Sequence, residues 1–140
     1  MSIDLFGGKW KQDNVLPDNF VEFMNAAGIN KNVQDQVSQI RYINEFEADG
    51  DNWVYKISVQ GMPETKNYPF KFDEPYSSTD LFGSPFKCVV TKLADNKIQE
   101  TITESIGNKM VVVKTVENDS TMSTVTTAGD VSCRIKFTKM

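Results

Sequence analysis

Residues that favour tight turns recur along this sequence about eleven residues apart, from residue 49 to the end. They are Asp49-Gly50, Gly61, Gly83, Asp95-Asn96, Gly107-Asn108, Asn118-Asp119 and Gly129-Asp130. The segments between them alternate in polarity or are rich in β-branched residues. This pattern predicts strands over Tyr42–Ala48, Asn52–Gln60, Phe86–Leu93, Lys97–Glu104, Met110–Glu117, Thr121–Thr127 and Ser132–Lys139. Strands joined in this order by short turns predict an antiparallel meander.

The first forty residues have a helical period instead. Four apolar side chains fall at i, i+3, i+4 and i+7, the spacing of one helical face: Phe20, Phe23, Met24 and Ala27. We expect Asn19 to cap this helix, Glu22 to complete a capping box, and Gly28 to follow its end. A second short helix is predicted after Asn30, with its apolar face formed by Val33, Val37 and Ile40. Each helix has only about two turns, so both need to pack on the rest of the molecule.

One strand, two short helices and a long run of hairpins make up the predicted topology. A sheet of nine or ten strands leaves edges open to pairing unless it curls, so we expect a barrel with the helices as a lid over one mouth. A barrel of this size encloses more room than its own side chains usually fill. The chain of 140 residues is predicted to form a single domain over residues 1–140.

The faces of the predicted strands bear on whether the barrel is hollow. Along residues 97–104, Lys97, Gln99, Thr101 and Thr103 lie on one face, and Ile98, Glu100, Ile102 and Glu104 lie on the other. Neither face is cleanly apolar, which favours a cavity that holds water and a ligand. The alternative is that these are ordinary half-exposed strands of a β-sandwich.

The composition excludes several function classes. The chain contains no histidine, so it lacks the commonest general base and the commonest zinc ligand. No serine or cysteine can have a histidine partner, and the acidic pairs Asp73-Glu74 and Asp49/Asp51 fall in predicted turns. We therefore expect a protein that is not an enzyme and that uses neither a metal nor a cofactor.

The net charge bears on the expected binding partners, and the first residues bear on the expected cellular compartment. The net charge is -4 and the lysines are scattered, so nucleic acid is not expected as a partner. The first eight residues have no basic stretch followed by an apolar run, which predicts a cytoplasmic protein. In that compartment Cys88 and Cys133 are expected to be free thiols.

Several segments resemble the fatty-acid-binding proteins, a family of intracellular lipid-binding proteins. That family opens with a glycine-x-tryptophan strand, followed by an asparagine-phenylalanine helix that ends in glycine. The matching residues are Gly8-Lys9-Trp10-Lys11, Asn19-Phe20-Val21-Glu22-Phe23-Met24, Gly28, Asp49-Gly50-Asp51, Phe70-Lys71-Phe72, Phe86-Lys87-Cys88-Val89-Val90 and Gly129-Asp130-Val131-Ser132-Cys133-Arg134-Ile135. Their order and spacing cover nearly the whole chain.

The resemblance implies a mainly β fold, a ten-stranded antiparallel up-and-down β-barrel of the lipocalin or calycin kind capped by a two-helix lid. It also implies a ligand carboxylate held by inward cations, which in the family are an arginine on the eighth strand and an arginine-x-tyrosine pair on the tenth. Matched by turn position, these sites fall on Lys114, Arg134 and Lys136, of which only Arg134 matches in kind. A lysine cannot make the planar two-toothed contact of an arginine with a carboxylate.

The last strand can be interpreted in two ways. Either Arg134 and Lys136 face the cavity, or both are solvated while Cys133, Ile135 and Phe137 face inward. Lys114 shares a face with apolar neighbours, so it fits either the point where a lipid head group meets its tail or a surface position.

The expected ligand is a long-chain fatty acid bound non-covalently, with its tail against Phe20, Met24, Val37 and Tyr55. A retinoid, bile acid, haem or tetrapyrrole pigment in the same fold is the alternative. We expect a monomeric carrier with at most transient membrane contact, because Lys31 and Arg41 near the lid bring only modest attraction to anionic lipid.

Overall fold

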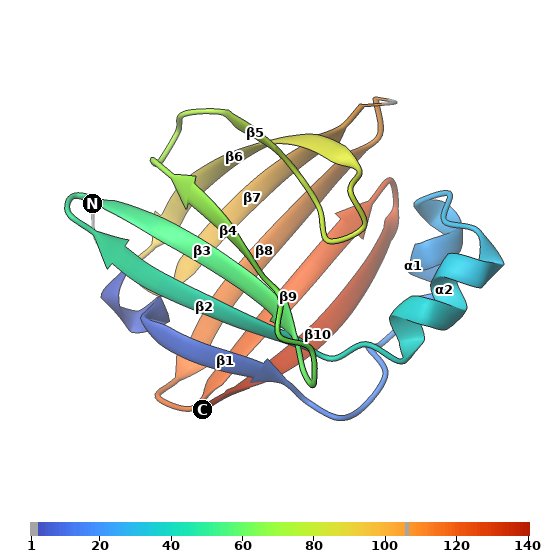
Figure 1. Cartoon of the computed structure of the whole chain (residues 1–140), viewed down its shortest axis with the longest axis horizontal. Coiled ribbons are helices and arrows are strands. Elements are labelled where there is room, and N and C mark those ends of the chain that lie inside the picture. The colour runs from blue at the N-terminus through green and yellow to red at the C-terminus, as the bar shows by residue number, and fades with distance from the viewer. Residues whose placement is uncertain (1–2, 106) are drawn as a thin grey trace.

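Ten antiparallel strands form one sheet that curls into a nearly closed barrel (Figure 1). The computed structural model describes residues 3–105 and 107–140, so the first two residues of the segment used above to predict the compartment lie outside it. The strands are β1 (Gly8–Gln12), β2 (Tyr42–Asp49), β3 (Asn52–Val59), β4 (Thr65–Phe70), β5 (Tyr76–Thr79), β6 (Pro85–Ala94), β7 (Lys97–Glu104), β8 (Lys109–Asn118), β9 (Thr121–Ala128) and β10 (Val131–Lys139). Their order in the sheet is β4-β3-β2-β1-β10-β9-β8-β7-β6-β5. The predicted ten-stranded barrel with a helical lid is confirmed.

The barrel closes through side chains rather than backbone pairing at one place, between β4 and β5. These two strands stand at opposite ends of the sheet order and are not paired with each other. The Tyr68 hydroxyl donates a hydrogen bond to the backbone carbonyl of Thr79 at 2.7 Å, and Lys66 Nζ donates to the Thr79 hydroxyl at 2.7 Å. Pro69 lies in β4, a position that an edge strand tolerates because its N–H is not needed for the ladder.

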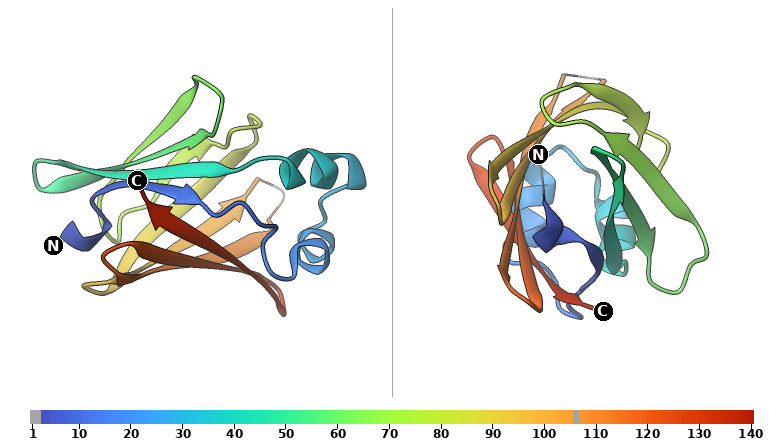
Figure 2. Two further views of the ribbon diagram at one scale, coloured as in Figure 1. Left: turned by 90° about the horizontal axis from the view of Figure 1, so that it is seen from below. Right: turned by 90° about the vertical axis from the view of Figure 1, so that its left-hand side faces the viewer.

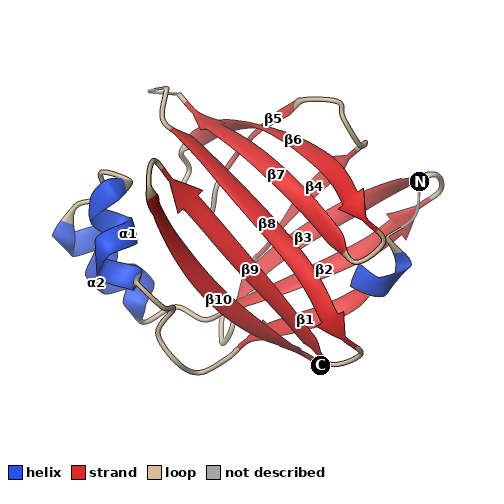
Figure 3. Cartoon of the chain, turned by 180° about the vertical axis from the view of Figure 1, so that it is seen from behind, coloured by secondary structure: helices blue, strands red, loops and turns tan. Residues whose placement is uncertain are grey.

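Two short helices, α1 (Phe20–Ala26) and α2 (Lys31–Ser38), lie at one end of the barrel (Figures 1 and 3). Asn30 caps α2 as predicted, since its side chain accepts a hydrogen bond from the Val33 N–H. Gly28 has a φ of 73°, which confirms its left-handed position after α1. The capping box at Asn19 is wrong: this residue is itself left-handed, with a φ of 65°, and its side-chain amide donates to the Ser132 carbonyl on β10 at 3.0 Å.

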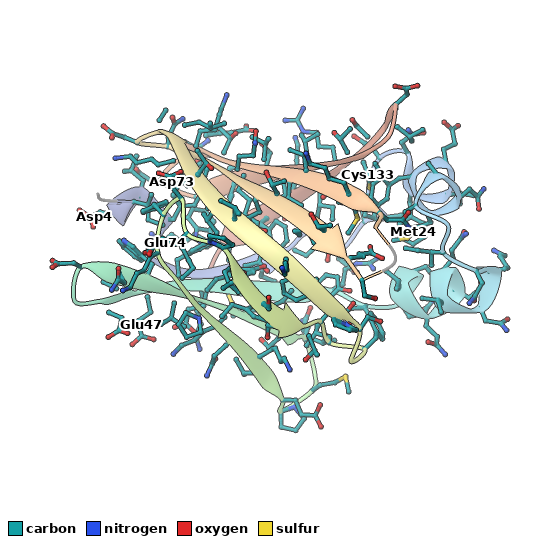
Figure 4. The ribbon with its side chains drawn as sticks, turned by 90° about the horizontal axis from the view of Figure 1, so that it is seen from above. Asp4, Met24, Glu47, Asp73, Glu74 and Cys133 are labelled. Atoms are coloured by element: carbon teal, nitrogen blue, oxygen red, sulfur yellow. The ribbon has the colours of Figure 1, made fainter. Side chains whose placement is uncertain are left out.

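The end of the barrel away from these helices is filled. A short 3-10 helix, η1 (Asp4–Phe6), lies at this end, and Figure 4 shows Asp4 opposite Met24 and Cys133, which lie at the helix end. Trp10 is fully buried, and its indole N–H donates to the Phe6 carbonyl at 2.9 Å. The core around it comprises Ile3, Phe6, Trp10, Phe46, Trp53, Phe70, Cys88, Val90, Ile98, Val116, Met122 and Phe137. Figure 2 shows η1 and the two helices at opposite ends of the barrel. The main cavity lies in the half nearer the helices, where Tyr42 and Met110 are among its lining residues.

Candidate functional site

A cavity of about 270 Å³ occupies the helix half of the barrel. This volume lies just below the roughly 300–1,000 Å³ typical of small-molecule pockets. Side chains of β2 to β8 and of the turn between β5 and β6 line it, and most of its wall is apolar or aromatic. The interior is therefore hollow at one end and solid at the other.

Aromatic rings form a continuous wall on one side of this cavity. The ring of Tyr55 stacks on Phe46, with centroids 5.0 Å apart, and on Tyr68, with centroids 6.1 Å apart. Tyr68 in turn meets Phe86 edge to face at 5.6 Å. Such rings offer apolar surface to a hydrocarbon chain, and the tyrosine hydroxyls add polar points at fixed positions.

The floor of the cavity holds a buried ion pair. Lys114 on β8 and Glu100 on β7 are 3 % and 7 % exposed, and Lys114 Nζ lies 3.1 Å from Glu100 Oε1. Along β7, Ile98 belongs to the packed core whereas Ile102 lines the cavity, so Glu100 stands at the boundary between them. The Lys114 ammonium also lies 3.9 Å from the centroid of the Tyr55 ring, within the range of a cation–π contact.

Electrostatics keep this lysine charged. Burial favours the neutral amine, but the Glu100 carboxylate and the Tyr55 phenol raise the pKa of Lys114 above its ordinary value. Tyr55 is held in place by a hydrogen bond that its hydroxyl donates to Asn44 Oδ1 at 2.9 Å. The floor is thus a polar cluster whose charges balance within the protein itself.

Among the three predicted cations, only Lys114 faces the interior. Arg134 is exposed on the outer face of β10, where its guanidinium pairs with Glu117 at 3.1 Å, and Lys136 is exposed two residues further on. The prediction that these two residues face the cavity is wrong. The inward positions of β10 are those of Cys133, Ile135 and Phe137, as in the alternative interpretation of this strand. A match by turn position does not fix the face of a side chain, because a shift of one residue reverses the face of a strand.

The predicted tail contacts divide between two spaces. Tyr55 lines the main cavity, whereas Phe20, Met24 and Val37 line a second space of about 100 Å³ between the helices and the barrel. Tyr42 lines both, so the two spaces lie on either side of one side chain. Contact of these residues with a ligand stays a prediction.

Three residues in or next to these spaces were not predicted as binding residues: Glu100, Thr124 and Arg41. Glu100 shares a face with Ile98 and Ile102, and a carboxylate between two inward apolar residues is the signal that identifies it. Thr124 stands opposite Lys114 in the β8–β9 register, and its buried hydroxyl has no hydrogen-bond partner among the described residues. Arg41 lines the space under the helices, where its guanidinium donates to the carbonyls of Ser38 and Ile40, both at 2.9 Å.

Residues 3–105 and 107–140 are the part of the chain that the structure describes, and they contain no metal cluster or membrane-spanning helix. This part of the chain has no group of three or more cysteine, aspartate and glutamate side chains placed to hold a metal ion. Within the same residues no helix is long and apolar enough to cross a membrane. Cys88 and Cys133 are both free and buried, as predicted, and burial raises the pKa of Cys88 to about 12 and that of Cys133 to about 11.

No protein-family model matches the chain, but individual proteins do. A fatty acid-binding protein of Schistosoma japonicum is 28% identical over 127 residues, which cover 91% of this chain and 92% of that protein. A liver-type fatty acid-binding protein of Takifugu rubripes is 29% identical over 127 residues and covers 79% of this chain and 94% of its own length. The structure of a Schistosoma mansoni fatty acid binding protein in complex with arachidonic acid superposes with a TM-score of 0.88 at 26% identity, over 100% of this chain and 99% of the other.

The chain is similar to fatty-acid-binding proteins in sequence and has the same fold. Its departure from the pattern of fatty-acid-binding proteins lies in the charges of the interior. The inward arginine-x-tyrosine pair expected on the tenth strand is absent, since Ile135 and Phe137 take inward positions with that spacing. The interior cation that remains, Lys114, already has a carboxylate partner.

Proposed function

We propose that this protein is a carrier that binds a fatty acid or similar single-chain lipid non-covalently inside its barrel. The observation that supports this most directly is the mainly apolar cavity of about 270 Å³, closed by packed side chains at one end and bordered at the other by the turn residues Leu81 and Phe82. The tail would lie along Tyr55, Tyr68 and Phe86, and the head group would reach the polar floor at Glu100, which pairs with Lys114 behind it.

Similarity to fatty-acid-binding proteins supports the same function, since the relatives are named for fatty acid binding and a similar solved structure contains arachidonic acid. We propose a carrier rather than an enzyme because the cavity wall offers no nucleophile paired with a base among the described residues. The Cys88 thiol at the wall has a raised pKa and stays protonated at neutral pH. We further propose that the protein acts as a cytoplasmic monomer that transfers its ligand with only transient membrane contact and without binding nucleic acid.

Chain length provides the test of lipid binding. Apolar burial contributes roughly 0.8 kcal/mol per methylene, so each added methylene should lower the Kd of a saturated ligand about fourfold until the cavity is full. Titration calorimetry of delipidated protein with alcohols and acids of increasing length at one pH measures this. Native mass spectrometry of the protein as isolated identifies the lipid it carries.

A matched pair of variants locates the site. Ile102→Trp places a large ring in the cavity, whereas Thr103→Trp places the same ring on the exposed face of the same strand. We expect the first to lose lipid binding and the second to keep it, with both remaining folded by circular dichroism. Equal binding by both variants would place the lipid elsewhere.

A further inference from the structure

The charged side chains that line the main cavity are acidic. Asp80, Glu100 and Glu104 line it, and no lysine or arginine does among the described residues. Lys114 lies behind this wall, where Glu100 pairs with it and the Tyr55 ring covers it at 3.9 Å. A head group that enters the cavity therefore meets the carboxylate of the ion pair before the ammonium.

The floor has one positive and one negative charge, and they cancel. The groups on other strands that interact with Glu100 are Lys114 on β8, Tyr55 on β3, Tyr76 on β5 and Cys88 on β6. Burial raises the pKa of the two tyrosines and the cysteine, so all three are neutral near pH 7. Lys114 is thus the cation among them, and Glu100 neutralises it.

An ionised ligand carboxylate at this floor would add a second anion to a single cation. Burying a charge without compensation is costly, and two close carboxylates favour a state in which one of them is protonated. An alcohol or another uncharged head group leaves the charge balance unchanged, and its hydroxyl can donate to Glu100. The buried hydroxyl of Thr124, opposite Lys114, adds a polar group without adding charge.

We propose that this cavity selects single-chain lipids in an uncharged form, so that an alcohol binds as it is and a fatty acid binds together with one proton from solvent. The proposal rests on the proposed function. In the acid complex, one proton is shared between the ligand carboxyl and Glu100, one carboxyl donating a hydrogen bond to the other. Lys114 keeps its proton and its pairing, and no covalent bond other than that to the transferred proton changes.

Proton uptake can be counted directly with the unmodified protein. Calorimetric titration with decanoic acid and with 1-decanol, in two buffers of different ionisation enthalpy, gives the number of protons bound with each ligand. We expect about one proton with the acid and none with the alcohol, and a Kd for the acid that rises about tenfold per unit between about pH 6 and pH 8. Acid binding without proton uptake and with a constant Kd would overturn the proposal but leave the lipid-binding function intact. Failure of both ligands to bind would instead contradict the proposed lipid-binding function.

Two variants assign the effect to Glu100. Glu100→Gln should let the ionised acid pair with Lys114, abolish proton uptake and tighten acid binding about tenfold or more at about pH 8. Glu117→Gln is the matched control, because Glu117 also pairs with a cation, Arg134 at 3.1 Å, but lies on the outer face away from the cavity. It should keep the proton uptake, and loss of uptake in this control would overturn the role of Glu100. If Glu100→Gln does not fold, the comparison of acid and alcohol binding by the wild-type protein still tests whether the acid binds with a proton.

Discussion

Lys114 and Glu100 stand on neighbouring strands, two residues out of direct register, and their side chains meet inside the barrel at 3.1 Å. Glu100 pairs in register with Val112, and Lys114 pairs with Ile98, so the ion pair runs diagonally across β7 and β8. Both side chains are buried, and the charge of each one offsets the energetic cost of burying the other.

Removing one partner of this pair should destabilise the fold strongly. We expect Lys114→Met to lower the free energy of unfolding by about 3–5 kcal/mol, because Glu100 would remain buried without a cation. The double variant Lys114→Met/Glu100→Gln removes both charges and should recover most of that loss. Urea unfolding near pH 7 measures the three proteins; a double variant as unstable as the single one would show that the charge is not the cause.

The control for this prediction is an ion pair at the surface. Lys56 and Glu47 also form a salt bridge, but their side chains are 28% and 55% exposed. Lys56→Met should therefore change the free energy of unfolding far less than Lys114→Met does. A comparable loss in both lysine variants would mean that burial does not set the energy of these pairs.

Arg134 should be dispensable for the ligand. Its guanidinium lies on the outer face and pairs with Glu117, with side chains 46% and 36% exposed. We expect Arg134→Ala to lower stability by less than about 1 kcal/mol and to change lipid Kd by less than about twofold. The same calorimetric titration measures this. A large loss of lipid affinity in Arg134→Ala but not in Glu117→Ala would show that Arg134 takes part in ligand binding.

Much of the fold follows from local sequence signals. Turn residues at even spacing bound β2, β3 and β6 to β10, because tight turns require residues that tolerate positive φ; Gly50 and Gly129, for example, have φ values of 63° and 60°. The strands β4 and β5 were not bounded by these signals. They are short edge strands in a segment with Pro63, Pro69 and Pro75, and their closure depends on contacts of Thr79 with side chains distant in sequence.

The candidate site was less predictable, because it depends on which face of each strand points inward. Lys114 lies inside with Val112 and Val116, on an apolar stripe that the alternation already shows. On β10 the apolar stripe is Cys133, Ile135 and Phe137, and this local pattern decided the orientation against the family match. The pairing of Lys114 with Glu100 joins two strands across a hairpin, and only the register of the sheet brings them together.

The side-chain closure between β4 and β5 should control local opening of the barrel. Tyr68→Phe removes the hydrogen bond to the Thr79 carbonyl and should cost about 0.5–1.5 kcal/mol. We expect amide hydrogen exchange in β5 to accelerate and lipid dissociation to speed up with it. Tyr55→Phe is the control: it loses a hydrogen bond of the same kind, to Asn44, in a part of the wall where the strands are paired. Faster exchange in β5 for both variants alike would indicate general destabilisation instead of local opening.

Stability should fall at alkaline pH in part through Cys88. Its pKa is raised from 9.0 to about 12 by burial, so in this range the unfolded chain releases the thiol proton first. Because the pKa is higher in the folded state, the buried thiol contributes its full stabilisation below about pH 9. This contribution is lost as the pH rises towards 12. Between about pH 9 and pH 10 this thiol should account for a loss of up to about 1 kcal/mol. Urea unfolding at both pH values measures the loss in wild type and in Cys88→Ala, whose lower absolute stability should vary less with pH; parallel losses in the two proteins would assign the alkaline effect to the tyrosines.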